Sequence, residues 1–240
     1  MFRQDYLLRT IHVFIDALIL LMRSCRDQDF HRARSILAQT WEDIFGLPTA
    51  SVMALSERTL LAILMKRSAG AVDIALMAAR LFKEDAALSV AEGQKDGGQR
   101  LYLKALNCYL EISLEPSVGP DEFRWINENI TASGIVTDPH DAITELLGLL
   151  ESELPLATMV LLFRYYERYG QLGKAEDTLF HLLDDYPGES EFAKLGLGFY
   201  ERLESMENDC LERGGLPRGE VGEGLKQLRC RIRHLGYVFD

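Results

Sequence analysis

The chain has few cysteines for its length. Only 4 of its 240 residues are cysteine, and no two of them form the closely spaced pair that metal and redox sites use. A small secreted protein stabilised by disulfides would need a denser pattern. The scattered thiols therefore favour a reduced, cytoplasmic protein. We expect no thiol to act as a nucleophile, because no histidine partner is positioned to activate one.

The chain also has no apolar run of membrane-spanning length. The apolar stretch from Ile11 to Met22 is too short to cross a bilayer and contains His12 and Asp16. No small-residue cleavage site of a signal peptide follows it. We therefore expect a buried amphipathic helix here and no membrane partner. His12 and Asp16 are four residues apart and are expected to satisfy each other at the edge of the core.

Basic residues are fewer than acidic residues. The sequence has 26 Lys and Arg against 37 Asp and Glu, which gives a formal net charge of −11. Non-specific binding to nucleic acid depends on a positive surface that contacts phosphates, so we expect no nucleic-acid partner. The 48% hydrophobic and 26% charged content is typical of a folded globular protein, and the 9% aromatic content argues against disorder.

Catalytic and metal-binding patterns are missing as well. The five histidines form no pair four residues apart, as many metal-binding helices require. The glycines of Gly93–Gly98 are not followed by the lysine-then-hydroxyl ending of a phosphate-binding loop, and the stretch is interpreted as a polar turn. His181 with Asp184 and Asp185 is better explained by a solvated helix face. The sequence therefore predicts no catalytic residue, no metal site, no cofactor and no enzymatic activity.

What the chain does contain is helical periodicity, clearest between Leu156 and Glu189. Apolar residues recur there at steps of three and four, which places them on one face of a helix. Gly170 and Gly173 bracket a turn, and Pro187 ends the second helix because it lacks the backbone donor. The stretch predicts two antiparallel helices. Their apolar positions are Met159, Leu162, Phe163, Tyr166 and Tyr169, then Ala175, Leu179, Leu182 and Leu183.

This hairpin resembles a tetratricopeptide (TPR) unit, whose period is about 34 residues. The aromatic Tyr166, the small Ala175 and the closing Pro187 stand at three characteristic positions of that unit. A small residue at the crossing lets the two helices approach closely. Leu162 and Gly170 are also in register, whereas Met159 and Phe163 stand where the pattern has tryptophan and glycine.

The same periodicity predicts further helices and no strand. We therefore predict an all-α fold of antiparallel helix pairs, stacked as a TPR-like right-handed superhelix. Turn-forming residues from Glu115 to Pro120 indicate a boundary. The predicted segments are 1–114, a connection with a short helix over 115–138, and 139–240, or else one continuous domain. The predicted helices cover about 4–23, 30–45, 56–67, 72–91, 101–110, 121–131, 139–153, 190–211 and 221–235.

The first half of the chain resembles a family of uncharacterised bacterial proteins with TPR-like helices. The residues that carry the resemblance are Gln4 to Ile11, the Asp29-Phe30 turn, Ala33 and the ending Phe45-Gly46-Leu47. The resemblance implies a bacterial, cytoplasmic helical-repeat protein. It supplies no activity and no catalytic residues.

One constellation of side chains is a candidate for function. The TPR register places Arg164 and Arg168 on the groove-lining face of one helix, and Lys194 and Arg202 on that of the next. Guanidinium groups bind carboxylates through two parallel hydrogen bonds. We therefore expect a non-enzymatic interaction module that binds an acidic peptide or a partner protein in a concave groove.

Other interpretations of the sequence remain open. In one alternative, the four cations bind no ligand and form ordinary surface ion pairs with Glu167, Glu201 and Glu204. In a second alternative, the chain is a structural protein that forms homo-oligomers through its apolar terminal helices. In a third, it is a helical protein that binds a small ligand. The basic stretch Arg229–His234 is a second patch, which would dock on the acidic body of the protein or on a partner.

Overall fold

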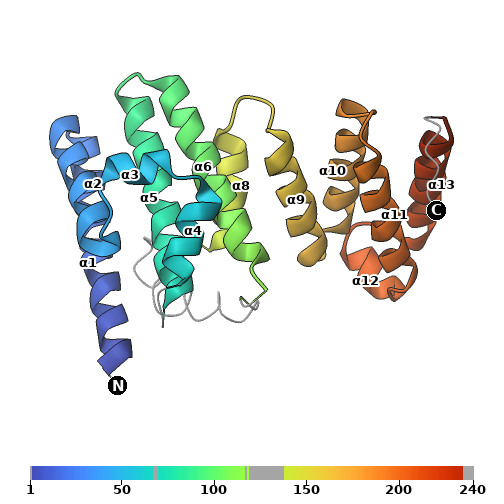
Figure 1. Cartoon of the computed structure of the whole chain (residues 1–240), viewed down its shortest axis with the longest axis horizontal. Coiled ribbons are helices and arrows are strands. Elements are labelled where there is room, and N and C mark those ends of the chain that lie inside the picture. Colours follow the sequence, from blue (N-terminus) through green and yellow to red (C-terminus); the bar gives the residue numbers. More distant parts are fainter. Residues whose placement is uncertain (1, 67–69, 117, 119–137, 235–240) are drawn as a thin grey trace. The chain divides into compact units, whose positions relative to one another are not determined.

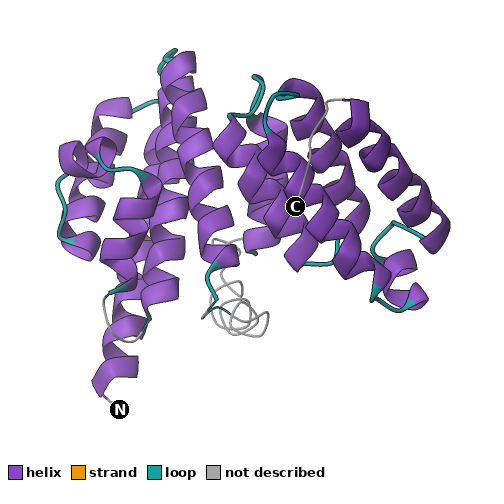
Figure 2. Cartoon of the chain, turned by 45° about the vertical axis from the view of Figure 1, so that its right-hand side comes forward, coloured by secondary structure: helices purple, strands orange, loops and turns teal. Residues whose placement is uncertain are grey.

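The structure is a computed structural model of the chain and describes residues 2–66, 70–116, 118 and 138–234, with side chains from Leu7 onward. Over these ranges the chain forms twelve helices and no strand (Figures 1 and 2). The predicted all-α class is therefore confirmed. The helices are α1 (Phe2–Arg26), α2 (Phe30–Phe45), α3 (Thr49–Ala54), α4 (Glu57–Met65), α5 (Ala71–Ala91), α6 (Lys95–Leu114), α8 (Pro139–Leu149), α9 (Leu156–Arg168), α10 (Leu172–Asp185), α11 (Ser190–Glu204), α12 (Asn208–Arg213) and α13 (Arg218–His234).

The contacts divide the chain into two compact units, Met1–Glu153 and Leu154–Asp240. The segment boundaries predicted from the sequence were at residues 114 and 138, which put the residues of α8 in the carboxyl-terminal segment. In the structure, α8 packs against α6 of the first unit. Lys83 of α5 also forms an ion pair with Glu145 of α8. The short helix expected over residues 121–131 lies outside the described residues.

Local sequence signals fix several helix ends where they were expected. The carboxylate of Asp29 accepts a hydrogen bond from a first-turn N–H of α2 at 3.1 Å, and Gly46 ends that helix in the left-handed conformation, with φ at 66°. Asp138 caps α8 in the same way at 2.7 Å, and Pro139 is its first residue. These caps give partners to backbone groups that a helix end leaves unpaired.

Helix α1 buries one apolar face, as expected for an amphipathic helix that packs on the core. Ile11, Phe14, Leu18 and Leu21 are each at most 4% exposed, and the helix packs against α2 and α5. The helix is longer than predicted at both ends. Among the helices that the structure describes, none combines the length and the apolar character that crossing a membrane requires.

Helix α5 lies at the centre of the first unit. It packs along α6 and also contacts α1, α2 and α4. Every residue from Asp73 to Lys83 is buried, so this part of α5 has no solvent face. Buried charges require partners. Arg80 pairs with Glu84 at 2.7 Å within the helix, and Lys83 pairs with Glu145.

The polar turn between α5 and α6 is shorter than the sequence predicted. Helix α6 begins at Lys95, so Gly98 belongs to its first turn. A Cβ at Gly98 would lie 3.0 Å from the carbonyl oxygen of Ala86 and closer still to the side chain of Val90, both in α5. Glycine at this position therefore lets the start of α6 approach α5 closely, which explains why it is tolerated inside a helix.

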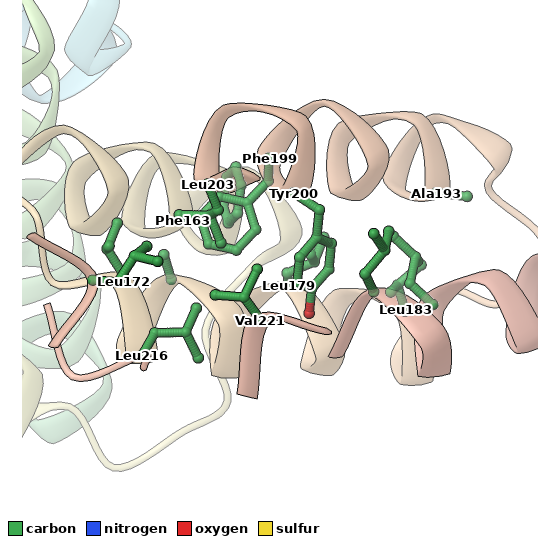
Figure 3. Packing of buried hydrophobic residues seen from close by; sticks show 14 residues of the cluster. Phe163, Leu172, Leu179, Leu183, Ala193, Phe199, Tyr200, Leu203, Leu216 and Val221 are labelled. Atoms are coloured by element: carbon green, nitrogen blue, oxygen red, sulfur yellow. The ribbon is translucent and has the colours of Figure 1, made fainter. Parts of the chain in front are cut away.

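The second unit is built around one apolar core (Figure 3). Helices α9 and α10 form the predicted hairpin, with Ala175 fully buried. Helix α11 packs on α10, and α13 packs on α11. Phe163 of α9 meets Phe199 of α11 edge-on, with ring centroids 5.4 Å apart. The core residues are Phe163, Leu172, Ala175, Leu179, Leu183, Ala193, Phe199, Tyr200, Leu203, Leu211, Leu216, Val221, Leu225 and Leu228.

Glycines permit close helix packing in this core. A Cβ at Gly196 of α11 would lie 2.9 Å from the Leu228 side chain and 3.1 Å from that of Leu179. Glycine at position 196 therefore lets α11 pack closely against α13 and α10. A Cβ at Gly224 of α13 would overlap the hydroxyl of Tyr200. That hydroxyl is 2.5 Å from a carboxylate oxygen of α10 and donates a hydrogen bond to it.

The single helix predicted from Ser190 to Leu211 is wrong. Helix α11 ends at Glu204, and the separate helix α12 begins at Asn208. The guanidinium of Arg218 occupies this break and donates to the Asn208 side chain at 2.9 Å. It also donates to backbone carbonyls at the end of α11 and in the segment that follows. These carbonyls belong to Leu203, Glu204 and Met206.

Two turns of the second unit dock on each other. The backbone N–H of Gly173, at the start of α10, donates to the carbonyl oxygen of Gly214 at 3.0 Å. A Cβ at Gly173 would lie 2.7 Å from the carbonyl oxygen of Gly215. The turn that leads into α10 therefore packs backbone to backbone against the turn between α12 and α13.

Candidate functional site

The four cations selected from the sequence lie on α9 and α11 of the second unit. Arg164 and Arg168 are one turn apart on α9, and Lys194 and Arg202 are two turns apart on α11. All four side chains are exposed. Arg168 and Lys194 also take part in other interactions within the structure. We call these four residues the basic face.

An ion pair joins the two helices of the basic face. Arg202 Nε donates to Glu167 Oε1 at 2.6 Å, across 35 residues of sequence. Glu167 shares a face of α9 with Arg164, three residues earlier, whereas Arg168 is the next residue and lies about 100° further round the helix. The structure therefore brings Arg202 to the side of α9 that carries Arg164.

This contact differs from the surface pairs that the sequence left open. Glu167 was one of the acidic partners considered, but only through contacts within one helix. The observed pair joins α9 to α11 instead. Glu167 is 19% exposed and Arg202 is 52% exposed, so half of the arginine side chain remains accessible to a ligand.

Gly198 of α11 lies between Lys194 and Arg202, one turn from each of them and on the same side of the helix. Within the described chain, the only side-chain atom near a Cβ built at Gly198 would be Arg202 Nη1, at 3.3 Å. Glycine at this position therefore leaves room for the Arg202 guanidinium to lie close to the backbone of α11.

The second basic patch, Arg229–His234, docks on its own unit. Arg231 forms an ion pair with Asp184 of α10. Its guanidinium also lies over the ring of Phe180, 5.0 Å from the centroid, an arrangement in which the ring face attracts the cation. Of the two outcomes considered for this patch, the structure shows contact with the acidic surface of α10.

A polar pocket in the first unit was not predicted from the sequence. Its volume is about 540 Å³, which lies within the range of about 300–1,000 Å³ of small-molecule sites. It lies among α2, α3, α5 and α6. Its lining residues are Arg34, Thr49, Met53, Asp85, Ser89, Gln94, Gly97, Arg100, Leu101 and Lys104.

Two cations of this pocket are already held by the protein. The guanidinium of Arg34 donates to the buried carboxylate of Asp85, to Ser89 Oγ at 2.9 Å and to Glu92 Oε2 at 2.6 Å. Burial raises the pKa of Asp85, and the nearby Arg34 opposes this only in part. The Arg34 contacts tie α2 to α5.

Lys104 ties α6 to the end of α3. Its ammonium donates to three backbone carbonyls, at 2.6, 3.2 and 3.3 Å. An ammonium has three N–H groups, so these bonds use all of its donors. Arg34 and Lys104 therefore join helices across this pocket and have little capacity left for a ligand. The three carbonyls belong to Val52, Met53 and Leu55.

The described residues contain no group of three or more His, Cys, Asp and Glu side chains arranged to hold a metal ion. His181, the nearest such candidate in the sequence, is exposed. Its Nδ1 lies 2.9 Å from the carbonyl oxygen of Asp177, one turn earlier in its own helix. The ring is thus engaged with the backbone of α10.

These observations define the protein as an all-helical protein of packed helix pairs that carries an exposed basic face on its second unit. A family profile matches residues 1–232, and the chain belongs to that family, which is described as a family of unknown function (DUF6483). The comparison with curated proteins and the comparison with solved structures gave no match. The uncharacterised family expected from the sequence is therefore confirmed.

Proposed function

We propose that the second unit is a non-enzymatic interaction module whose basic face binds carboxylates of an acidic peptide or partner protein. The observation that carries the proposal is the contact between Glu167 and Arg202, 35 residues apart. This separation is close to the TPR period of about 34 residues. Helices α9 and α10 would form one TPR-like unit, and α11 would begin the next. In such stacks, equivalent helices line an extended concave surface.

The Glu167–Arg202 pair also supports a carboxylate as the ligand. A carboxylate already lies against the Arg202 guanidinium in this arrangement. Arg164 and Arg168 offer two further guanidinium groups on the same side of α9. Such groups bind carboxylates bidentately and keep their charge at any physiological pH. Glycine at position 198 leaves room for the Arg202 guanidinium beside the backbone of α11.

The test compares two double charge reversals with matched geometry. Arg164→Glu/Arg168→Glu changes the basic face, and Arg229→Glu/Arg233→Glu is the control on α13. In each pair the two arginines are exposed and four residues apart. Both double variants replace two arginines by glutamates and therefore change the net charge by the same amount. The probe is an array of Asp- and Glu-rich peptides with free carboxyl termini. Fluorescence anisotropy then measures the affinity of the peptides retained.

We expect the basic-face variant to lose at least tenfold in affinity, and the control to stay close to the wild type. Binding should also weaken as salt rises, because exposed charges are screened. Equal losses in both variants would indicate attraction to net charge rather than a site. A wild-type protein that retains no acidic peptide would refute the proposal. Circular dichroism confirms that both variants remain folded.

A further inference from the structure

Helix α1 exposes an unusual amount of apolar surface. Seven large hydrophobic side chains are exposed among the described residues, and four of them lie on this helix. Its inner face is fully used by the core of the first unit. Val13 and Leu20 are seven residues apart and share the outer face of the helix, whereas Leu8 and Met22 lie on another side of it. Exposed apolar side chains that share a face are typical of an interaction surface. The four are Leu8 (40% exposed), Val13 (46%), Leu20 (41%) and Met22 (45%).

A regular stripe runs along this outer face. Its residues are Arg9, Val13, Asp16, Leu20 and Arg23, all of them exposed. They are separated by four, three, four and three residues, which is the spacing of a coiled-coil seam. We call them the outer stripe. A groove of about 400 Å³ lies beside it between α1 and α2, and Val13, Asp16 and Leu20 line it.

Asp16 lies at the middle of the outer stripe between two apolar side chains. The partner expected from the sequence, His12, does not hold it: both side chains are exposed, and the described structure has no hydrogen bond between them. Arg9 and Arg23 are each seven residues away, about 10.5 Å along the helix. Neither can pair with Asp16 within one helix, because such pairs form at three or four residues.

We propose that the outer stripe is a dimer interface, filled by α1 of a second copy of this chain running antiparallel to the first. A two-fold axis near Val13 places Arg9 opposite Asp16 of the second copy. The symmetry then places Asp16 opposite Arg9 of that copy. Both carboxylates gain a guanidinium partner, and Val13 packs against its own counterpart at the axis. A parallel pairing would place like charges opposite each other.

The length of the helix selects this register over its alternative. An axis near Leu20 would pair Asp16 with Arg23 of the second copy, but the two helices would then overlap over residues 13–26 only. That overlap is about 21 Å long, whereas the axis near Val13 gives an overlap over residues 2–23 of about 33 Å. A stable interface buries about 800 Å² on each partner, so the longer overlap is favoured.

Light scattering during size-exclusion chromatography tests the dimer on the full chain. The molar mass measured for the wild type should be twice the chain mass of 27.2 kDa. Arg9→Glu and Asp16→Arg should each weaken dimerisation at least tenfold, because each creates two like-charge contacts. The double variant Arg9→Glu/Asp16→Arg restores both pairs with exchanged charges and should recover the dimer.

Arg26→Glu is the control, since Arg26 is exposed on α1 but lies outside both the outer stripe and the overlap of residues 2–23. It should dimerise like the wild type. A wild type that stays monomeric at about 200 µM, far above the micromolar range of specific complexes, would overturn the proposal. A failure of the double variant to recover the dimer, or its recovery by Asp16→Arg/Arg23→Glu instead, would overturn the register. Thermal unfolding of each variant checks that α1 remains packed.

Discussion

Replacing Arg34 with methionine should destabilise the first unit, and the loss should be smaller in acid. Arg34 joins α2 to α5 through Asp85, Ser89 and Glu92. Methionine keeps part of the aliphatic volume and removes the charge. The side chain of Asp85 is only 2% exposed, so the substitution leaves a buried carboxylate without its cation.

The structure sets the size of this effect. Removing one partner of a fully buried ion pair costs about 3–5 kcal/mol. The Arg34 side chain is 36% exposed, however, and solvent screening lowers the cost to about 2–3 kcal/mol. For a domain of 150 to 250 residues, 1 kcal/mol shifts Tm by about 2–4 °C. We therefore expect Tm to fall by roughly 4–12 °C at neutral pH.

The pH dependence identifies Asp85 as the cause. Burial already raises the pKa of this carboxyl above its ordinary value of 3.8, and Arg34 opposes the rise. Without Arg34 the pKa should rise further. A folded-state pKa above the unfolded value means that stability is present below pH 3.8 and is lost as pH rises through the folded pKa. The difference between variant and wild type should therefore be small near pH 4 and full near pH 7.5.

Thermal and urea unfolding at these two pH values provide the assay. The double variant Arg34→Met/Asp85→Asn is the control, because it removes the carboxylate that has lost its cation. It should recover most of the loss at pH 7.5. If Arg34→Met loses as much stability at pH 4 as at pH 7.5, or if Asp85→Asn recovers nothing, the buried carboxylate is not the source of the effect.

Three further predictions follow from single positions. Gly98→Ala should destabilise the first unit by about 1–3 kcal/mol through overpacking, whereas Gly97→Ala has room for its Cβ and should be neutral or stabilising in urea unfolding. Burial raises the pKa of Glu176, so the stability of Glu176→Gln relative to the wild type should increase as pH rises above 4.5 in a thermal-unfolding series. Glu167→Gln removes the internal competitor on the basic face and should tighten acidic-peptide binding by anisotropy; weaker binding would contradict the proposed site.

The parts of the fold that depend on neighbouring residues could be predicted from the sequence. Asp29 and Gly46 lie at the ends of α2, and a cap acts on its own helix, so these bounds were correct. The hairpin of α9 and α10 was also recognisable, because its periodicity, turn glycines and Pro187 all lie within one stretch. The helical faces that carry the candidate cations follow from the same periodicity.

Features that depend on distant residues could not be predicted. The break after Glu204 is occupied by Arg218, and nothing in the local pattern indicates that the first residue of α13 will reach it. The pocket in the first unit joins Arg34 to a carboxylate 51 residues away. In the candidate site, periodicity placed Arg202 on a helix face, but its pairing with Glu167 depends on how α9 and α11 pack.

The docking of one turn on another in the second unit has a practical consequence for labelling the protein. The turn between α12 and α13 is fixed by backbone contact with Gly173, so a peptide tag inserted there would separate α10 from its neighbours. The turn between α10 and α11 is different, because Gly188 is exposed and no atom lies within 4 Å of a Cβ built on it. Exposed turns tolerate insertion best, and a fluorophore or epitope placed at Gly188 should report on the second unit without unfolding it.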